Sequence, residues 1–221
     1  MKDKDGIIKR LADPGVVPVL RLPEEDAPLV QDVLAAYRDA GVTAVELTMS
    51  MKGAPDLLRR AKERFGDTLL VGMGTVSSSA EAGVAVDAGA DFLVSPYPVP
   101  EALPVAVRAG VPFAMGALTP GEIRDVLAAG ADIVKIFPFS SMGGVEYLKM
   151  LKGPFGVMRT FPSGEVTREN VREAFAAGAT AVAIGPELVR PDLFRAGKWG
   201  ELVAIVREYI AFARSSNPLN T

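Results

Sequence analysis

One lysine stands inside a short apolar stretch, AGADIVKIFP, at residues 129–138. The neighbouring residues favour a buried β-strand, which places Lys135 at its centre. Burying an unpaired ammonium ion is costly, so this lysine must reach solvent, pair with an acid or have a chemical role. In an apolar pocket its pKa would fall, and the neutral amine could attack a carbonyl carbon and form a Schiff base. We favour this nucleophile over a structural, ion-paired lysine.

An acid interrupts a second apolar stretch in the same way. Glu46 lies in TAVELT, near the end of another predicted strand. A carboxyl group beside a Schiff base could transfer protons to and from the reacting carbons. It could equally serve only to balance the charge of Lys135. The sequence leaves both roles open for Glu46.

Two further polar residues follow predicted strands. Arg21 closes the stretch VPVLRLP, and a guanidinium there could hold a substrate carboxylate through two parallel hydrogen bonds. A surface arginine is the alternative. Thr75, in GMGTV, could add a hydroxyl to the same carboxylate or carbonyl.

A repeated pattern shows which elements must position these residues. An Ala-Gly pair followed by a short apolar run begins at residues 40, 88, 109, 129 and 177, as expected for a helix end that leads into a strand. Three more apolar runs begin at residues 15, 67 and 156, which makes eight strands. Helical stretches lie between them, at 26–40, 54–65, 119–129, 167–177 and 200–214, with Thr119 and Thr167 as candidate N-caps.

Eight strands alternating with helices predict an α/β fold, a single-domain (β/α)8 TIM barrel over residues 1–214 with a tail at 215–221. Active sites of such barrels lie at the carboxyl ends of the strands. We therefore expect Lys135, Glu46, Arg21 and Thr75 to lie close together at this end of the barrel, its mouth.

The composition excludes several kinds of function. The chain has 221 residues, a formal charge of −3, and neither histidine nor cysteine. Thiol catalysis, disulfides, histidine metal sites and serine–histidine triads are therefore excluded. The charge gives no reason to expect nucleic acid or a membrane surface as partner. Without a signal peptide or an apolar run of spanning length, we predict a cytoplasmic protein.

A set of motifs resembles a known family when it is taken together. VPVLR, AVELT, VGMGTV, ADFLVSP, LTPGEI, VKIFP, YLKMLKGPF and FPSGEV occur in that order and cover nearly the whole chain. They resemble the 2-keto-3-deoxy-6-phosphogluconate (KDPG) and 4-hydroxy-2-oxoglutarate (KHG) aldolases, which are class I pyruvate aldolases. The resemblance implies a (β/α)8 barrel, a homotrimer, and catalysis without metal or cofactor.

The resemblance also implies roles for individual residues. Lys135 would form the Schiff base with the keto carbon of pyruvate, and Glu46 would be the general acid and base. Arg21, Thr75, Pro96 and Phe137 would shape the pyruvate pocket. The roles of Pro96 and Phe137 rest on the resemblance alone, because nothing in their own pattern distinguishes them from loop and packing residues.

The sequence departs from the family pattern in two loops and at one position after Glu46. The family's TGGV after the seventh strand is here Ser163, Gly164, Glu165 and Val166, and its G-S after the eighth is Gly185 and Pro186, followed by Glu187. These loops form the usual phosphate site of such barrels, where a proline has no N–H to give and two carboxylates would repel phosphate. An arginine that many members carry four residues after the glutamate is Ser50 here.

We therefore expect a 2-keto-3-deoxy sugar acid to be cleaved to pyruvate and an aldehyde without phosphate, through contacts that include Ser163, Gly164, Glu165, Gly185 and Glu187. A phosphorylated substrate, bound through Ser163, Gly164 and Arg190, is the alternative. Oxaloacetate decarboxylation through the same imine, a non-catalytic scaffold or sugar-acid binding barrel, and a phosphosugar isomerase or epimerase also remain open. The presence of both Lys135 and Glu46 counts against a non-catalytic barrel.

Overall fold

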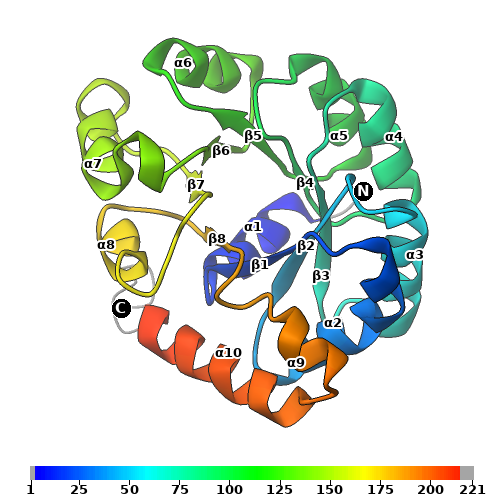
Figure 1. The fold of residues 1–221 in the computed structure, drawn as a ribbon. Helices are drawn as coiled ribbons and strands as arrows, with labels where there is room; N and C mark the ends of the chain where they lie inside the picture. Colours follow the sequence, from blue (N-terminus) through cyan, green and yellow to red (C-terminus); the bar gives the residue numbers. More distant parts are fainter. Residues whose placement is uncertain (1–2, 215–221) are drawn as a thin grey trace.

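Eight parallel strands form a closed ring in the computed structural model, which describes residues 3–214 (Figure 1). The strands are β1 (Val16–Leu20), β2 (Ala44–Thr48), β3 (Leu70–Gly74), β4 (Leu93–Val94), β5 (Phe113–Ala117), β6 (Ile133–Ile136), β7 (Thr160–Pro162) and β8 (Val182–Ile184). Each strand pairs with its neighbour in sequence, and β1 also pairs with β8. A bridge between Ser163 and Ala183 closes the ring between β7 and β8. The predicted (β/α)8 barrel is confirmed.

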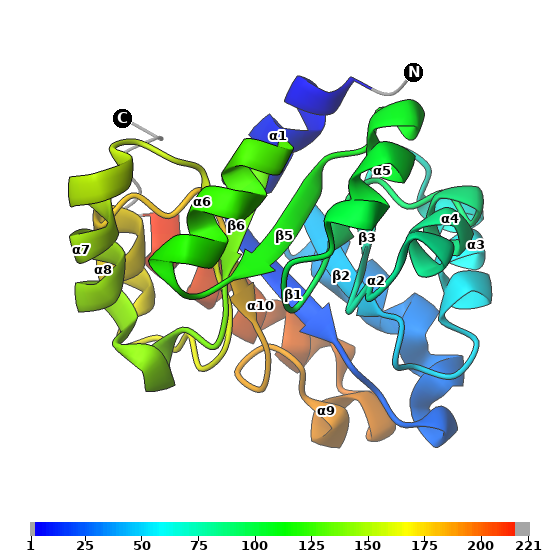
Figure 2. The same ribbon diagram turned by 90° about the horizontal axis from the view of Figure 1, so that it is seen from above.

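Helices surround this ring and connect its strands (Figures 1 and 2). They are α1 (Lys4–Ala12), α2 (Val30–Asp39), α3 (Ala54–Phe65), α4 (Ser79–Asp87), α5 (Leu103–Ala109), α6 (Pro120–Ala129), α7 (Gly144–Phe155), α8 (Val171–Ala176), α9 (Pro191–Arg195) and α10 (Trp199–Arg214). Short 3-10 turns precede α2, α5 and α7 at Glu24–Leu29, Pro100–Ala102 and Ser140–Met142. None of the helices in residues 3–214 has the length and apolar character needed to cross a membrane.

Of the two predicted N-caps, Thr119 is confirmed and Thr167 is wrong. Thr119 caps α6 as expected: its hydroxyl accepts the Glu122 N–H, and the Glu122 carboxylate accepts the Thr119 N–H in return. Thr167 does not cap α8, which begins at Val171. A turn comes first there, because the Asn170 side chain accepts the Thr167 N–H at 2.9 Å and holds these residues outside the helix.

Two separate apolar layers hold the barrel together. The larger lies between the strands and the outer helices, and the smaller fills the inside of the barrel. The inner layer includes Ile7, Ile8 and Leu11 of α1, a helix that was not among those predicted from the sequence. In Figure 1 this helix lies behind the centre of the ring. It therefore closes one end of the barrel and leaves the other end open.

The strand register places the two charged strand residues on the inner face. Glu46 follows Ala44 by two residues, and Lys135 follows Ile133 by two, and both of these neighbours belong to the inner layer. Alternate residues of a strand share one face, so Glu46 and Lys135 also point inward. The proposed tail at 215–221 lies outside the described residues.

Candidate active site

Lys135 lies inside the barrel and is almost fully enclosed, with 6% of its surface exposed. Its Nζ lies 5.2 Å from the centre of the Phe137 ring, two residues further along the chain. Burial lowers the pKa of the Lys135 ammonium, because water no longer solvates the charged form. Glu46 opposes this shift and Arg21 adds to it. The site thus favours the neutral amine that a nucleophile requires.

Glu46 is buried even more completely, with 1% of its surface exposed, and its Oε2 has no hydrogen-bond partner among the described residues. Burial raises the pKa of the Glu46 carboxyl, while Lys135 and Arg21 oppose the rise. The side chain fits because residue 74 is glycine: a Cβ there would collide with the Glu46 carboxylate. Glu46 and Lys135 attract each other, and no direct ion pair between them is present in residues 3–214.

Arg21 is held at the carboxyl end of β1 by hydroxyl groups from two other loops. Its Nη1 donates to Ser50 Oγ at 2.6 Å, and its Nη2 donates to Thr75 Oγ1 at 3.1 Å. Thr75 has a positive φ of 58°, which is uncommon for a residue other than glycine and marks a constrained backbone. The predicted convergence of Arg21 and Thr75 is present in the structure.

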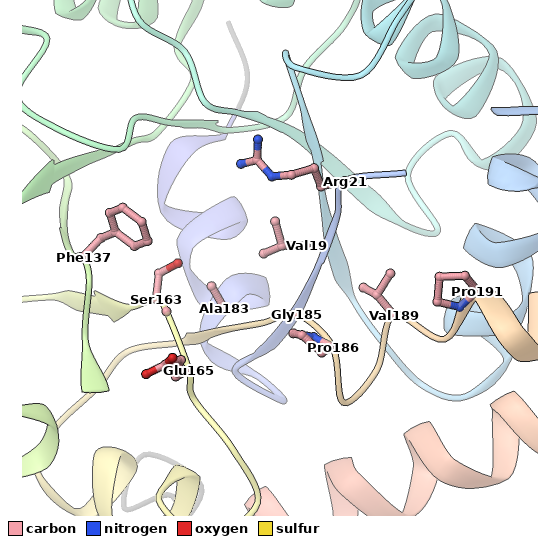
Figure 3. Close-up of a pocket in the computed structure, with 11 residues that line it drawn as sticks. Val19, Arg21, Phe137, Ser163, Glu165, Ala183, Gly185, Pro186, Val189 and Pro191 are labelled. Atoms are coloured by element: carbon pink, nitrogen blue, oxygen red, sulfur yellow. The ribbon is translucent and has the colours of Figure 1, made fainter. Parts of the chain in front are cut away.

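A cavity of about 510 Å³ opens beside these residues. Its walls come from β1, β8, the loops after β1, β6, β7 and β8, and the start of α9: Val19, Arg21, Phe137, Ser163, Gly164, Glu165, Ala183, Gly185, Pro186, Val189 and Pro191. In Figure 3 the side chains of Arg21 and Phe137 face each other across the opening. Lys135 and Glu46 are not part of this wall, but the Phe137 ring, which is, lies beside the Lys135 amine.

The loop residues predicted to contact the substrate divide into two groups. Ser163, Gly164, Glu165 and Gly185 line the cavity. Glu187 is not among the residues that line this cavity. Its Oε1 instead accepts the backbone N–H of Arg168 at 3.1 Å.

The groups around Glu187 explain why its carboxylate does not line the cavity. The carboxylate lies next to the buried Tyr209 hydroxyl of α10, whose pKa is raised first by burial and then by Glu187. A free main-chain N–H and a hydroxyl attract a carboxylate away from an apolar cavity wall. The sequence alone could not show this, because Tyr209 is far from Glu187 in the chain.

Pro96 borders a different hollow. It lines a second cavity, of about 320 Å³, together with Tyr97, Leu118 and Phe137. Phe137 therefore separates the two cavities, and 39% of its surface is exposed. Gly116 allows the Pro96 loop to fold over the strands, since a Cβ at residue 116 would collide with the Pro96 backbone.

Ser50 belongs to the site although its sequence pattern predicts no role for it. It stands where many family members have an arginine, and in the structure its hydroxyl contacts Arg21. A hydroxyl two residues beyond Thr48, at the end of a strand that carries Glu46, is the signal that could have found it. No group of three or more acidic, histidine or cysteine side chains within residues 3–214 is arranged to hold a metal ion.

Comparison with known proteins identifies the family. The model of the family described as "KDPG and KHG aldolase" matches residues 7–205. The chain belongs to the KDPG and KHG aldolase family. It is therefore a pyruvate-dependent aldehyde-lyase of the class I type.

Individual members of the family agree with this assignment. A 2-dehydro-3-deoxy-phosphogluconate aldolase from Haemophilus influenzae is 30% identical over 92% of this chain and 95% of its own length. A KDPG aldolase structure from Legionella pneumophila, with pyruvate captured as a covalent carbinolamine, is 26% identical with a TM-score of 0.81, over 92% of this chain and 97% of that one. A KDPG aldolase from Zymomonas mobilis with 3-phosphoglycerate has the same TM-score at 27% identity, over 98% and 99% of the two chains.

Proposed function

We propose that Lys135 is the Schiff-base nucleophile of an aldolase that interconverts a 2-keto-3-deoxy sugar acid with pyruvate and an aldehyde. One observation carries the proposal: a lysine on the inner face of β6 lies beside the mouth cavity in a setting that lowers its pKa. A buried lysine kept only for structure would be expected to have a direct acidic partner. The covalent pyruvate adduct of the Legionella relative supports the same chemistry.

In the cleavage direction the neutral Lys135 amine attacks the C2 keto carbon of the substrate and forms a carbinolamine. Loss of water gives a protonated imine. A base removes the proton from the C4 hydroxyl, the C3–C4 bond breaks, and its electron pair moves onto C3 and the imine nitrogen. The aldehyde leaves, and the remaining enamine is protonated at C3. Hydrolysis of the imine then releases pyruvate and restores the amine.

Glu46 is the group that moves these protons. Its carboxyl is buried near Lys135 and its pKa is raised, so it holds a proton more readily than an exposed carboxyl and can both accept and donate one. The unpartnered Oε2 leaves one oxygen free for a substrate hydroxyl or an intervening water. No other carboxyl in the described residues perturbs the pKa of Lys135.

Arg21 and Thr75 bind the carboxylate of the keto acid. Arg21 lines the cavity, and each of its Nη atoms makes a single hydrogen bond to the described residues. A guanidinium has five N–H groups, so several remain for a substrate carboxylate. Phe137 lines the same cavity and Pro96 the smaller cavity next to Phe137, and both supply apolar contact.

The aldehyde half of the substrate carries no phosphate. Glu165 brings a carboxylate to the loop after β7, and Pro186 has no N–H to offer. Two nearby donors are already used: the Ser163 N–H donates to the Ile136 carbonyl, and the Arg168 N–H donates to Glu187. Arg190 is held by both oxygens of Asp192, at 2.9 and 2.6 Å. These contacts reduce the number of donors that could compensate a phosphate dianion for its lost hydration.

Borohydride trapping tests the central proposal. The protein is incubated with pyruvate, reduced, digested and examined by mass spectrometry. We expect one adduct, on the peptide that contains Lys135, which Lys135→Met abolishes and the exposed Lys149→Met leaves unchanged. An adduct spread over surface lysines, or none, would contradict the proposal.

A comparison of two substrates tests the proposal that the aldehyde half carries no phosphate. Rates of pyruvate release are measured with 2-keto-3-deoxygluconate and with its 6-phosphate. We expect the larger kcat/KM for the unphosphorylated acid. A larger value for the phosphate would show that this chain shares the substrate named for its Haemophilus relative, while leaving the role of Lys135 intact.

Two expectations from the sequence accompany this proposal. A homotrimer follows from the family resemblance, and sedimentation should give three times the mass of one chain. A cytoplasmic location remains a prediction from the sequence and can be checked by fractionating cells that express the protein.

A further inference from the structure

We propose that Ser50 is a positioning residue for the substrate carboxylate: it fixes the guanidinium of Arg21 through a one-way chain of hydroxyl hydrogen bonds anchored on the backbone of β1. This inference rests on the proposed function, because it assigns Arg21 to the keto acid. Neither the family resemblance nor the strand pattern gives Ser50 a role. Three contacts among described residues carry it.

The Leu20 carbonyl, to which the chain is anchored, fixes the direction of each hydrogen bond. The Leu20 carbonyl can only accept, so the Thr48 hydroxyl donates to it, at 3.2 Å. A hydroxyl has one hydrogen, so Thr48 Oγ1 must accept from Ser50 Oγ, which lies 3.0 Å away. The Ser50 hydrogen is then used as well. Only lone pairs of Ser50 remain to face Arg21 Nη1, at 2.6 Å.

This chain of hydrogen bonds limits the mobility of the Arg21 side chain. Arg21 has a long side chain in an exposed position at the end of β1, and ordering such a side chain costs entropy. Ser50 lies 29 residues from Arg21 in the sequence, and Thr48 lies 28 residues from Leu20. The hydrogen bonds therefore connect the Arg21 guanidinium to the backbone of β1 through residues at the end of β2. With its position fixed in advance, Arg21 loses less freedom when it binds a carboxylate.

A neutral acceptor is the suitable partner for this purpose. A carboxylate at position 50 would also hold Arg21, but it would cancel its charge and compete with the substrate. An uncharged hydroxyl leaves the full positive charge of Arg21, which helps to keep the pKa of Lys135 low. Ser50 thus orients the cation without neutralising it.

Thr75 has a different part in the same group. Its Oγ1 accepts from Arg21 Nη2 at 3.1 Å, and no described residue accepts its hydrogen. That hydrogen is available for a substrate carboxylate. Thr75 therefore touches substrate, whereas Ser50 acts through Arg21.

The first test measures KM and kcat for the keto acid in Ser50→Ala, Ser50→Thr and the control Ser79→Ala, an exposed serine on α4. Loss of one hydrogen bond to a charged group should raise KM about fivefold with little change in kcat. Ser50→Thr keeps the hydroxyl and should recover most of the loss. In an Arg21→Met background the Ser50→Ala change should have no effect, since Ser50 acts only through Arg21.

The second test does not depend on catalysis. Pyruvate binding is measured by calorimetry in Lys135→Met, which cannot form the imine, with and without Ser50→Ala. We expect Ser50→Ala to weaken binding by about the same factor of five. Equal affinity, or an equal loss in the Arg21→Met background, overturns the role of Ser50. A missing borohydride adduct at Lys135 in the unmodified protein would instead overturn the proposed function.

Discussion

The two sides of the barrel mouth differ in how many of their polar side chains already form hydrogen bonds within the protein. On the β1–β3 side, Arg21, Ser50 and Thr75 form one hydrogen-bonded group next to the buried Glu46. On the β7–β8 side, the cavity wall is made of glycine, proline and aliphatic residues, with Ser163 and Glu165 as its polar members. The first side is ordered before any substrate arrives, and the second offers space with few fixed contacts.

This difference matches the two halves of an aldol substrate. Every substrate of this reaction contains the same pyruvate unit, so a preorganised set of groups on the β1–β3 side can serve them all. The aldehyde half varies between substrates, and the β7–β8 side can change without disturbing the nucleophile. We infer that residues on the first side control the rate of the reaction and residues on the second control the choice of aldehyde.

The largest expected effect comes from Glu46→Gln, on the ordered side. The amide keeps the shape of the side chain but cannot take up a proton, so kcat should fall about a thousandfold. Pyruvate should still form a trapped adduct with Lys135. Steady-state kinetics with borohydride trapping separates these results, and the exposed Glu63→Gln on α3 is the control. A loss below tenfold would leave Glu46 as a counter-charge for Lys135.

Arg21→Met should have the next largest effect. Removing charge-assisted hydrogen bonds to the carboxylate should lower kcat/KM about a hundredfold, mainly through KM. The exposed Arg108→Met on α5 should leave both constants unchanged. If kcat fell and KM stayed constant, Arg21 would act on the chemistry instead of on binding.

Glu165→Gln tests the opposite side of the mouth. Removing one negative charge near a bound phosphate relieves about 1 kcal/mol of repulsion, so the ratio of kcat/KM for phosphorylated over unphosphorylated substrate should rise about fivefold. Activity on the unphosphorylated acid should change little. Glu169→Gln removes an exposed charge that does not line the cavity and is the control. An unchanged ratio would mean that Glu165 does not face the aldehyde half.

The smallest effect is a pair of opposite shifts in the pH profile. The amine must be neutral to attack, so kcat/KM rises as pH passes through the Lys135 pKa, which burial holds below its ordinary value of 10.5. Glu46 raises this pKa and Arg21 lowers it. Glu46→Gln should therefore shift the rise to lower pH, and Arg21→Met should shift it to higher pH. Shifts in the same direction would contradict the electrostatic account.

The sequence by itself determined the barrel and its two central charges. Five Ala-Gly repeats marked where helices lead into strands, and with three further apolar runs they predict eight strands alternating with helices, a pattern that few folds share. Lys135 and Glu46 were found because a charge inside an apolar strand is too costly to be accidental. Such signals are local, since each depends on a residue and its immediate neighbours in the chain.

Only the tertiary structure decided what touches what across the mouth. Ser50 and Thr75 lie 29 and 54 residues from Arg21, and no local pattern brings their hydroxyls to its guanidinium. Glu187 follows β8 as the sequence predicts, yet the Arg168 N–H and Tyr209 draw its carboxylate away from the cavity. The ring of Phe137 over Lys135 likewise depends on how the chain turns after β6. The direction of a side chain depends on the hydrogen bonds and packing that distant segments provide, and these exist only when the barrel has closed.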